Sequence, residues 1–124
     1  MKKLPESELE LMMIIWHANK PVTRMEIEKE LSEERKIGAT TILSFLSRLQ
    51  EKEFVKVEKM GKNNLYLPLI NEDEYLQRFS KSILKTLYQN SIKNFVTSLY
   101  DGNSLTEKDL KELEAFIAEK KTDR

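Results

Sequence analysis

The sequence contains no cysteine, only three glycines and three prolines, and a single histidine among its 124 residues. Without cysteine the chain can form neither disulfides nor a thiolate metal site, which fits a reducing compartment. Its longest hydrophobic run, residues 11–16, is far too short to cross a bilayer, and no signal-peptide core follows the first five residues. These absences predict a cytoplasmic protein that does not enter the membrane.

Side chains suited to catalysis are equally scarce. With one histidine, no cysteine and no glycine-rich phosphate loop, no residue can be named as a nucleophile or general base. His17 ends a predicted helix without convergent partners, which favours a surface or half-buried role. The pairs Glu6/Glu10 and Glu26/Glu30 have helical spacing, but solvated or capping roles explain them better than metal ligation. The sequence therefore predicts no enzyme, no cofactor and no metal site.

The charges balance, with 21 Lys and Arg against 21 Asp and Glu. A protein that binds nucleic acid chiefly by attraction to phosphates is markedly basic. Any DNA binding by this chain must therefore depend on local placement of charge and on shape, with weak non-specific binding. With 40% hydrophobic residues, the chain should fold as one domain or one domain with an extension.

Residues 37–53 form the most informative stretch. At helical periodicity one side is apolar and consists of Ile42, Phe45, Leu46 and Leu49. The opposite side consists of Thr40, Ser44, Ser47 and Glu51. Small hydroxyl side chains allow close approach to another polymer and can hydrogen-bond to phosphates or base edges. The pattern leaves two interpretations open, a docking helix and an ordinary solvated one.

Two shorter predicted helices precede this stretch and a hairpin follows it. The first helix begins at Pro5 and ends near residues 19–21, and the second opens with a capping box at Thr23 and Glu26 and runs to about Glu33. A short basic loop with Arg35 and Lys36 leads into the third helix.

After Glu53 the apolar period changes from 3.6 to 2, with turn residues at 60–64. Three helices followed by a hairpin is the order of a winged helix-turn-helix, whose third helix enters the major groove while the hairpin lies along the backbone. A small α+β domain with an ordinary surface hairpin is the alternative.

Residues 71–124 are predicted to be helical, with a break at residues 101–103 and Thr106 capping the last helix. This segment holds too much apolar surface to stay in water and too few residues to bury it alone. We expect a two-fold dimer that places two third helices about 34–36 Å apart, one DNA turn. The predicted dimer interface consists of Phe79, Ile83, Leu87, Phe95, Leu99, Leu110, Leu113, Phe116 and Ile117. Packing of this segment on its own winged domain in a monomer is the alternative.

Over nearly its whole length the chain resembles the penicillinase-repressor family of bacterial transcription factors, the BlaI/MecI/CopY group. In the N-terminal half the resemblance is carried by Glu8, Glu10, Met12 and Trp16 of the first helix, by Thr40-Thr41-Ile42, and by Phe45-Leu46 and Arg48-Leu49. Around the hairpin it is carried by Lys52, Phe54 and Tyr66-Leu67-Pro68-Leu69.

The resemblance implies a mostly α fold with a small β-hairpin: a winged helix-turn-helix in residues 1–70 and a helical dimerisation region in residues 71–124. It implies repression by occupation of palindromic promoter sites, with double-stranded DNA and a second copy of the chain as partners. The predicted DNA-binding residues are Thr40, Thr41, Leu43, Ser44, Ser47, Arg48, Lys59, Lys62 and Asn63. Those of the third helix would face bases or nearby phosphates, with Arg48 on the backbone and the wing tip beside it.

The sequence also departs from the family pattern. Relatives usually carry a long polar side chain where this chain has Leu43, a glycine where it has Glu53, and an aromatic and a small polar cap where it has Ile37 and Gly38. Leu43 cannot donate to a guanine edge but can touch a thymine methyl, so the family's base preference does not transfer.

The inducer does not transfer either. In antibiotic-responsive members a membrane sensor triggers cleavage at an Asn-Phe bond, but Ser98-Leu99 aligns there, and Asn94-Phe95 lies one helical turn earlier. The metal-binding cysteines of the copper-responsive members are absent. Neutral charge, Leu43 and Glu51 keep a second functional hypothesis open, a winged-helix protein-interaction module that has lost DNA binding.

Overall fold

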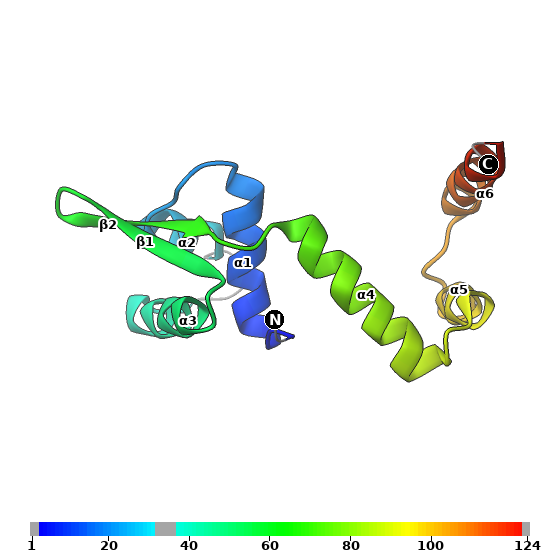
Figure 1. Ribbon diagram of the computed structural model, residues 1–124, viewed down its shortest axis with the longest axis horizontal. Coiled ribbons are helices and arrows are strands. Elements are labelled where there is room, and N and C mark those ends of the chain that lie inside the picture. Colours follow the sequence, from blue (N-terminus) through cyan, green and yellow to red (C-terminus); the bar gives the residue numbers. More distant parts are fainter. Residues whose placement is uncertain (1–2, 32–36, 123–124) are drawn as a thin grey trace. The chain divides into compact units, whose positions relative to one another are not determined.

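The computed structural model describes residues 3–31 and 37–122 (Figure 1). In chain order its elements are α1 (Glu6–Ala18), α2 (Arg24–Leu31), α3 (Ala39–Glu51), β1 (Val55–Met60), β2 (Asn63–Pro68), α4 (Glu72–Tyr88), α5 (Ile92–Asp101) and α6 (Glu107–Thr122). The predicted fold class, mostly α with one small hairpin after the third helix, is confirmed. The chain divides into two compact units, Met1–Phe79 and Ser80–Arg124.

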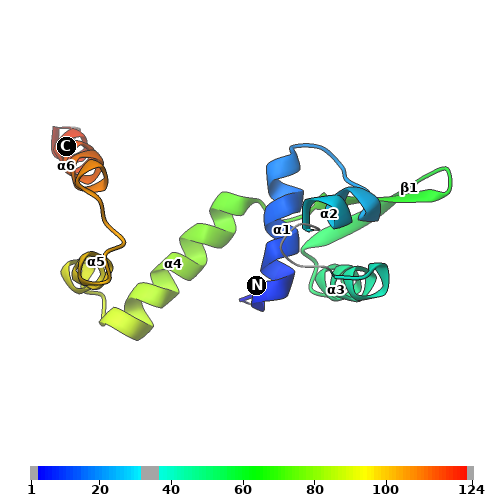
Figure 2. The ribbon, with the colours of Figure 1, turned by 180° about the vertical axis from the view of Figure 1, so that it is seen from behind.

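The N-terminal unit has a single hydrophobic core. Figures 1 and 2 show α1, α2 and α3 gathered together, with the turn of the hairpin projecting free of them. The predicted apolar side of α3 is buried at Ile42, Leu46 and Leu49, and Phe45 is half-buried against the core. The other fully buried large side chains are Leu11, Met12, Ile15, Ile27, Phe54 and Val55. The exposed side of α3 is held in place by the core behind it.

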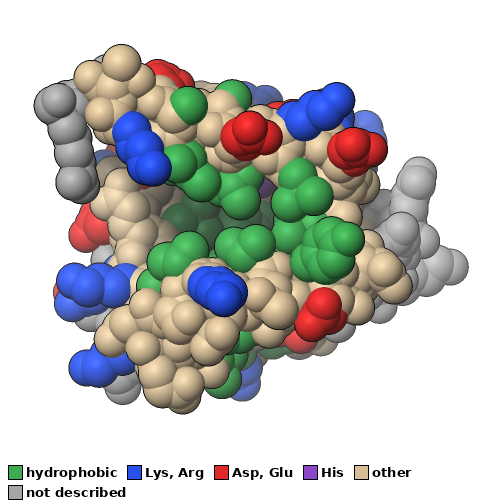
Figure 3. All heavy atoms as spheres, turned by 90° about the vertical axis from the view of Figure 1, so that its right-hand side faces the viewer, with side chains coloured by type: hydrophobic (Ala, Val, Ile, Leu, Met, Phe, Trp, Pro, Cys, Tyr) green, Lys and Arg blue, Asp and Glu red, His purple; other side chains and the backbone are tan. Residues whose placement is uncertain are grey.

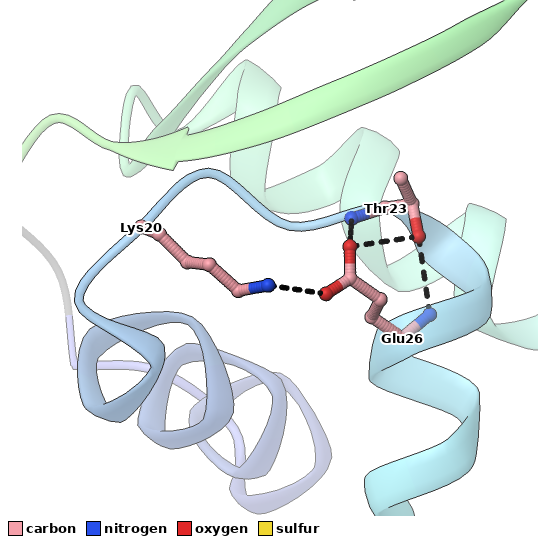
Figure 4. Close-up of polar contacts among 3 residues, drawn as sticks. All are labelled: Lys20, Thr23 and Glu26. Atoms are coloured by element: carbon pink, nitrogen blue, oxygen red, sulfur yellow. Dashed lines mark hydrogen bonds and ion pairs between the residues drawn. The ribbon is translucent and has the colours of Figure 1, made fainter.

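The capping box predicted at the start of α2 is present (Figure 4). The Thr23 hydroxyl accepts a hydrogen bond from the Glu26 backbone N–H at 3.2 Å, and Glu26 Oε1 accepts one from the Thr23 N–H at 3.1 Å. Lys20 Nζ lies 3.1 Å from the other carboxylate oxygen of Glu26. The hydrogen bond from Lys20 and then that from Thr23 lower the pKa of the Glu26 carboxyl below its ordinary value of 4.5.

The first turns of α4 pack within the N-terminal unit. Tyr75 is buried, its hydroxyl accepts a hydrogen bond from the Leu4 N–H at 3.0 Å, and its ring centroid lies 4.6 Å from that of Phe79. His17 is exposed, with Nε2 2.7 Å from a carboxylate oxygen of Glu72. Packing with the N-terminal unit thus continues beyond the predicted division at residue 70. The place of Phe79 in a dimer interface stays a prediction.

The long helix predicted to run from residue 71 to residue 101 is interrupted, and that expectation was wrong. Gln89 and Asn90 have φ of 47° and 66°, and the Asn90 N–H donates to the Leu84 carbonyl at 3.0 Å, which ends α4. Ser91 then caps α5 by accepting a hydrogen bond from the Asn94 N–H at 3.1 Å. The sequence places neither glycine nor proline here, but asparagine tolerates the left-handed conformation that ends helices.

The hairpin turn is tighter than expected. β1 and β2 pair from Val55↔Pro68 to Met60↔Asn63, so only Gly61 and Lys62 lie between the strands. Gly61 has φ of 64°, as the first central residue of a primed two-residue turn requires.

Candidate nucleic-acid interface

The predicted DNA-facing residues of α3 are exposed along its whole length. Thr40, Thr41, Leu43, Ser44, Ser47 and Arg48 all lie on the solvent side of the helix. Leu43 is 44% exposed, which is unusual for a leucine in the middle of an otherwise polar surface. The structure therefore gives α3 a narrow accessible face of hydroxyls with one apolar side chain at its centre.

An open groove of about 540 Å³ separates α3 from the hairpin. Leu43 and Ser47 line it from α3, and Lys59 lines it from β1. These three predicted residues are thus brought together. The groove also holds Asn64, which lies in the predicted wing tip and is the strand partner of Lys59. It holds Gln50 as well, which the predicted site did not include, although Gln50 follows Ser47 by one helical turn.

The remaining predicted residues lie outside the groove lining. Arg48 lies on the exposed side of α3, with its guanidinium carbon 5.9 Å from the centre of the Phe45 ring. Lys62 is in the hairpin turn, and Asn63 pairs with Met60 at the hairpin end. The candidate surface therefore has three parts: the groove, the outer side of α3 and the wing tip.

Three cations of this surface are free of ion pairs with the described residues. Among the described residues, no acidic side chain forms an ion pair with Arg48, Lys59 or Lys62. Lys56 differs, because its Nζ lies 3.1 Å from a carboxylate oxygen of Glu58 on the same strand face. Arg35 and Lys36, also expected near the third helix, lie outside the described residues. A chain without net charge can thus present unpaired cations at one surface.

An ion pair between a buried glutamate and a half-buried lysine anchors the end of α3. Glu8 of α1 is only 2% exposed, and its carboxylate lies 2.7 Å from Nζ of Lys52, the C-cap residue of α3. The next residue, Glu53, has φ of 63°, and buried Phe54 donates its N–H to the Leu49 carbonyl at 2.9 Å. These contacts fix the turn that sets α3 beside the hairpin.

The C-terminal unit has no core of its own. No described residue beyond residue 79 is buried. The exposed large hydrophobic side chains include Leu87 at 64% and Phe116 at 54%. Figure 3 shows hydrophobic side chains gathered on one face of the molecule, with Lys, Arg, Asp and Glu around them. Besides Leu87 and Phe116, the exposed large hydrophobic side chains of the C-terminal unit are Ile83, Ile92, Phe95, Tyr100, Leu110, Leu113 and Ile117.

Three other expectations concern the whole chain. Among the described residues no helix is long and apolar enough to span a membrane. Within residues 3–31 and 37–122, no three His, Asp or Glu side chains come together as a metal site would need. Ser98 and Leu99 lie inside the regular helix α5, and nothing there supports cleavage by a sensor protease.

Comparison with known proteins gives consistent matches. The model of the family described as penicillinase repressor matches residues 4–119. The penicillinase repressor of Bacillus licheniformis is 31% identical over 124 residues, covering 98% of this chain and 96% of the relative. The solution structure of the DNA-binding domain of the repressor BlaI has 35% identity and a TM-score of 0.52, over 60% of this chain and 94% of that one. The solution structure of the Bacillus licheniformis BlaI monomeric form in complex with the blaP half-operator has 32% identity and a TM-score of 0.51. That match covers 60% of this chain and 89% of the BlaI chain.

Proposed function

Because the chain belongs to the penicillinase repressor family, a family of DNA-binding repressors and not of enzymes, we propose that it acts as a homodimeric, sequence-specific repressor. In this proposal it occupies a palindromic promoter operator, with α3 in the major groove and the hairpin on the backbone. The cytoplasm is the expected location, and no cofactor is needed.

The observation that carries the proposal is the groove between α3 and the hairpin. It is lined by the polar side chains of Ser47, Gln50 and Lys59 and by apolar side chains of the hairpin. A sugar-phosphate strand has matching chemistry, because deoxyribose packs on apolar side chains while phosphates accept hydrogen bonds from hydroxyls, amides and amines. With one strand in the groove, the outer side of α3 faces base edges. Ser44 can hydrogen-bond there, and Leu43 can contact a thymine methyl.

The exposed hydrophobic side chains of α4, α5 and α6 support the dimer. Helices of this length gain little stability alone in water and depend on burying an apolar face. A second copy supplies the same face, and a two-fold axis makes one patch complementary to itself. In the BlaI structure, a monomeric form is in complex with a half-operator. This supports the proposal that each half of the operator binds one winged unit.

The alternative is a winged-helix protein-interaction module that has lost DNA binding. Its support is the exposed Leu43 and the zero net charge. Both functions predict an accessible α3, but only the repressor predicts a salt-dependent affinity for duplex DNA.

The roles can be separated by measuring affinity for duplexes selected from a random pool, at several salt concentrations. Arg48→Ala should weaken binding to all duplexes alike and reduce the salt slope by about one unit, because one phosphate contact is lost. Ser44→Ala or Leu43→Ala should instead change which duplex is preferred. Lys56→Ala is the matched control, since Glu58 already pairs with that lysine. Failure of the wild-type chain to enrich any duplex at low salt would refute the repressor proposal.

A further inference from the structure

The tip of the hairpin combines side chains that contact with phosphates alone does not explain. Met60, the last residue of β1, is 61% exposed, and its strand partner is Asn63. Lys62 lies between them in the two-residue turn. An amine in this position suits a phosphate, but a thioether gains nothing from a charged, hydrated partner.

The pairing register of β1 and β2 determines from which face of the hairpin each of these side chains projects. Directly opposed residues of an antiparallel pair share one face, with Cβ atoms about 4.5–5.5 Å apart. Met60 and Asn63 therefore project together from one face, while Lys59 and Asn64 project from the other, into the groove beside α3. The apex thus has an apolar group beside an amide on its outer face.

The tip is also open to solvent, since residues 60–63 are all exposed. Apart from the two neighbours of Gly61 in the chain, no described atom lies within 4 Å of the place where a Cβ on Gly61 would be. The nearest acid on β1, Glu58, is held by Lys56 at 3.1 Å. Packing within the hairpin therefore does not account for the exposed methionine, and no unpaired acid of β1 adjoins it.

The minor groove of DNA matches this set of groups. It is about 6 Å wide with walls of deoxyribose and a floor of base-edge acceptors, and it carries no exocyclic amine where the pair is A·T. Paired strands lie about 4.8 Å apart, so a two-residue turn is narrow enough to approach it. Proteins that read this groove combine lysine or asparagine with inserted apolar side chains, methionine among them.

We propose that the wing tip, residues 60–63, enters the minor groove that flanks each half-site and makes the chain select A·T pairs there. Met60 packs against the sugar walls, while Asn63 and Lys62 donate to the acceptors of the base edges. The proposal rests on the repressor function and deepens it, because it assigns sequence reading to the wing in addition to contact with the backbone.

The test alters only the minor groove. The full chain is used to select a duplex from a random pool, and A·T pairs flanking the α3 contacts are replaced one at a time by 2,6-diaminopurine·T. This base adds an amino group in the minor groove and leaves the major-groove edge of adenine unchanged. On each side of the α3 contacts there should be one flanking pair at which this replacement lowers the affinity of the wild-type chain about 5- to 20-fold.

Two variants connect this effect to the tip. Met60→Ala and Asn63→Ala should bind the unmodified duplex more weakly by a similar factor, and each should be less sensitive to diaminopurine than the wild type. Leu69→Ala is the matched control, because Leu69 is also an exposed apolar side chain, 52% accessible, at the opposite end of the hairpin. It should behave as the wild type does.

The outcomes separate the two proposals. A wild-type chain that binds its selected duplex but tolerates diaminopurine at every flanking pair would overturn the minor-groove proposal and leave the repressor function standing. Undiminished sensitivity in both tip variants would overturn it as well. If no duplex is enriched, the repressor function itself fails, and the wing proposal fails with it.

Discussion

Replacing Glu53 by glycine should stabilise the N-terminal unit. Glu53 follows the C-cap of α3 with φ of 63°, a conformation that costs residues with a Cβ about 1–2 kcal/mol. Glycine removes that cost but loses about 0.4–1 kcal/mol more backbone entropy on folding. The net gain in the free energy of unfolding should be about 0.5–1 kcal/mol. For a unit of this size, that corresponds to a rise in Tm of about 2–8 °C.

Trp16 provides the assay. It is the only tryptophan in the sequence, and it is 7% exposed in the core of the N-terminal unit, so its fluorescence reports the unfolding of that unit. Glu51→Gly is the matched control, because it removes the same charge from the last helical residue of α3. That variant should lose up to about 1 kcal/mol. A Glu53→Gly protein no more stable than the wild type would refute the reasoning.

Two further predictions concern charged groups of the same unit. Lys52→Met leaves the buried Glu8 carboxylate without its partner and should lower the free energy of unfolding, measured in urea, by about 3–5 kcal/mol. The double variant Glu8→Leu/Lys52→Met should recover most of that loss. A Lys52→Met protein as stable as the wild type would contradict the importance of this ion pair. The lowered pKa of Glu26 stabilises the fold above the ordinary value of 4.5, and this contribution is lost as the pH falls through the folded-state pKa. Between pH 4.5 and 2 the stability of Glu26→Gln should therefore fall less steeply than that of the wild type, and parallel curves would count against this prediction.

Local patterns predicted much of the fold. The apolar stripe of α3 and its hydroxyl side followed from helical period, and the cap at Thr23 followed from the spacing to Glu26. The same reasoning placed the wing and its lysines. These features depend on residues close together in the sequence, which is why they could be read without a structure.

Features that depend on tertiary contact or on unusual backbone conformations were not predicted. The ion pair of Glu8 with Lys52 joins residues 44 positions apart. The break after α4 uses Gln89 and Asn90 in left-handed conformations, without the glycine that would have marked it. Helical period places Gln50 near Ser47, but only the neighbouring hairpin, which forms the groove with α3, makes Gln50 part of the candidate site. In each case the deciding factor was a neighbour or a dihedral angle that periodicity does not encode.

Hydroxyl-radical footprinting of the 124-residue chain on its selected duplex tests the central claim most directly. Two winged units on a two-fold axis should protect two equivalent patches, with centres separated by about 10–10.5 base pairs or a whole multiple of that spacing. A single protected patch at saturation, or two patches half a helical turn out of phase, would contradict the account.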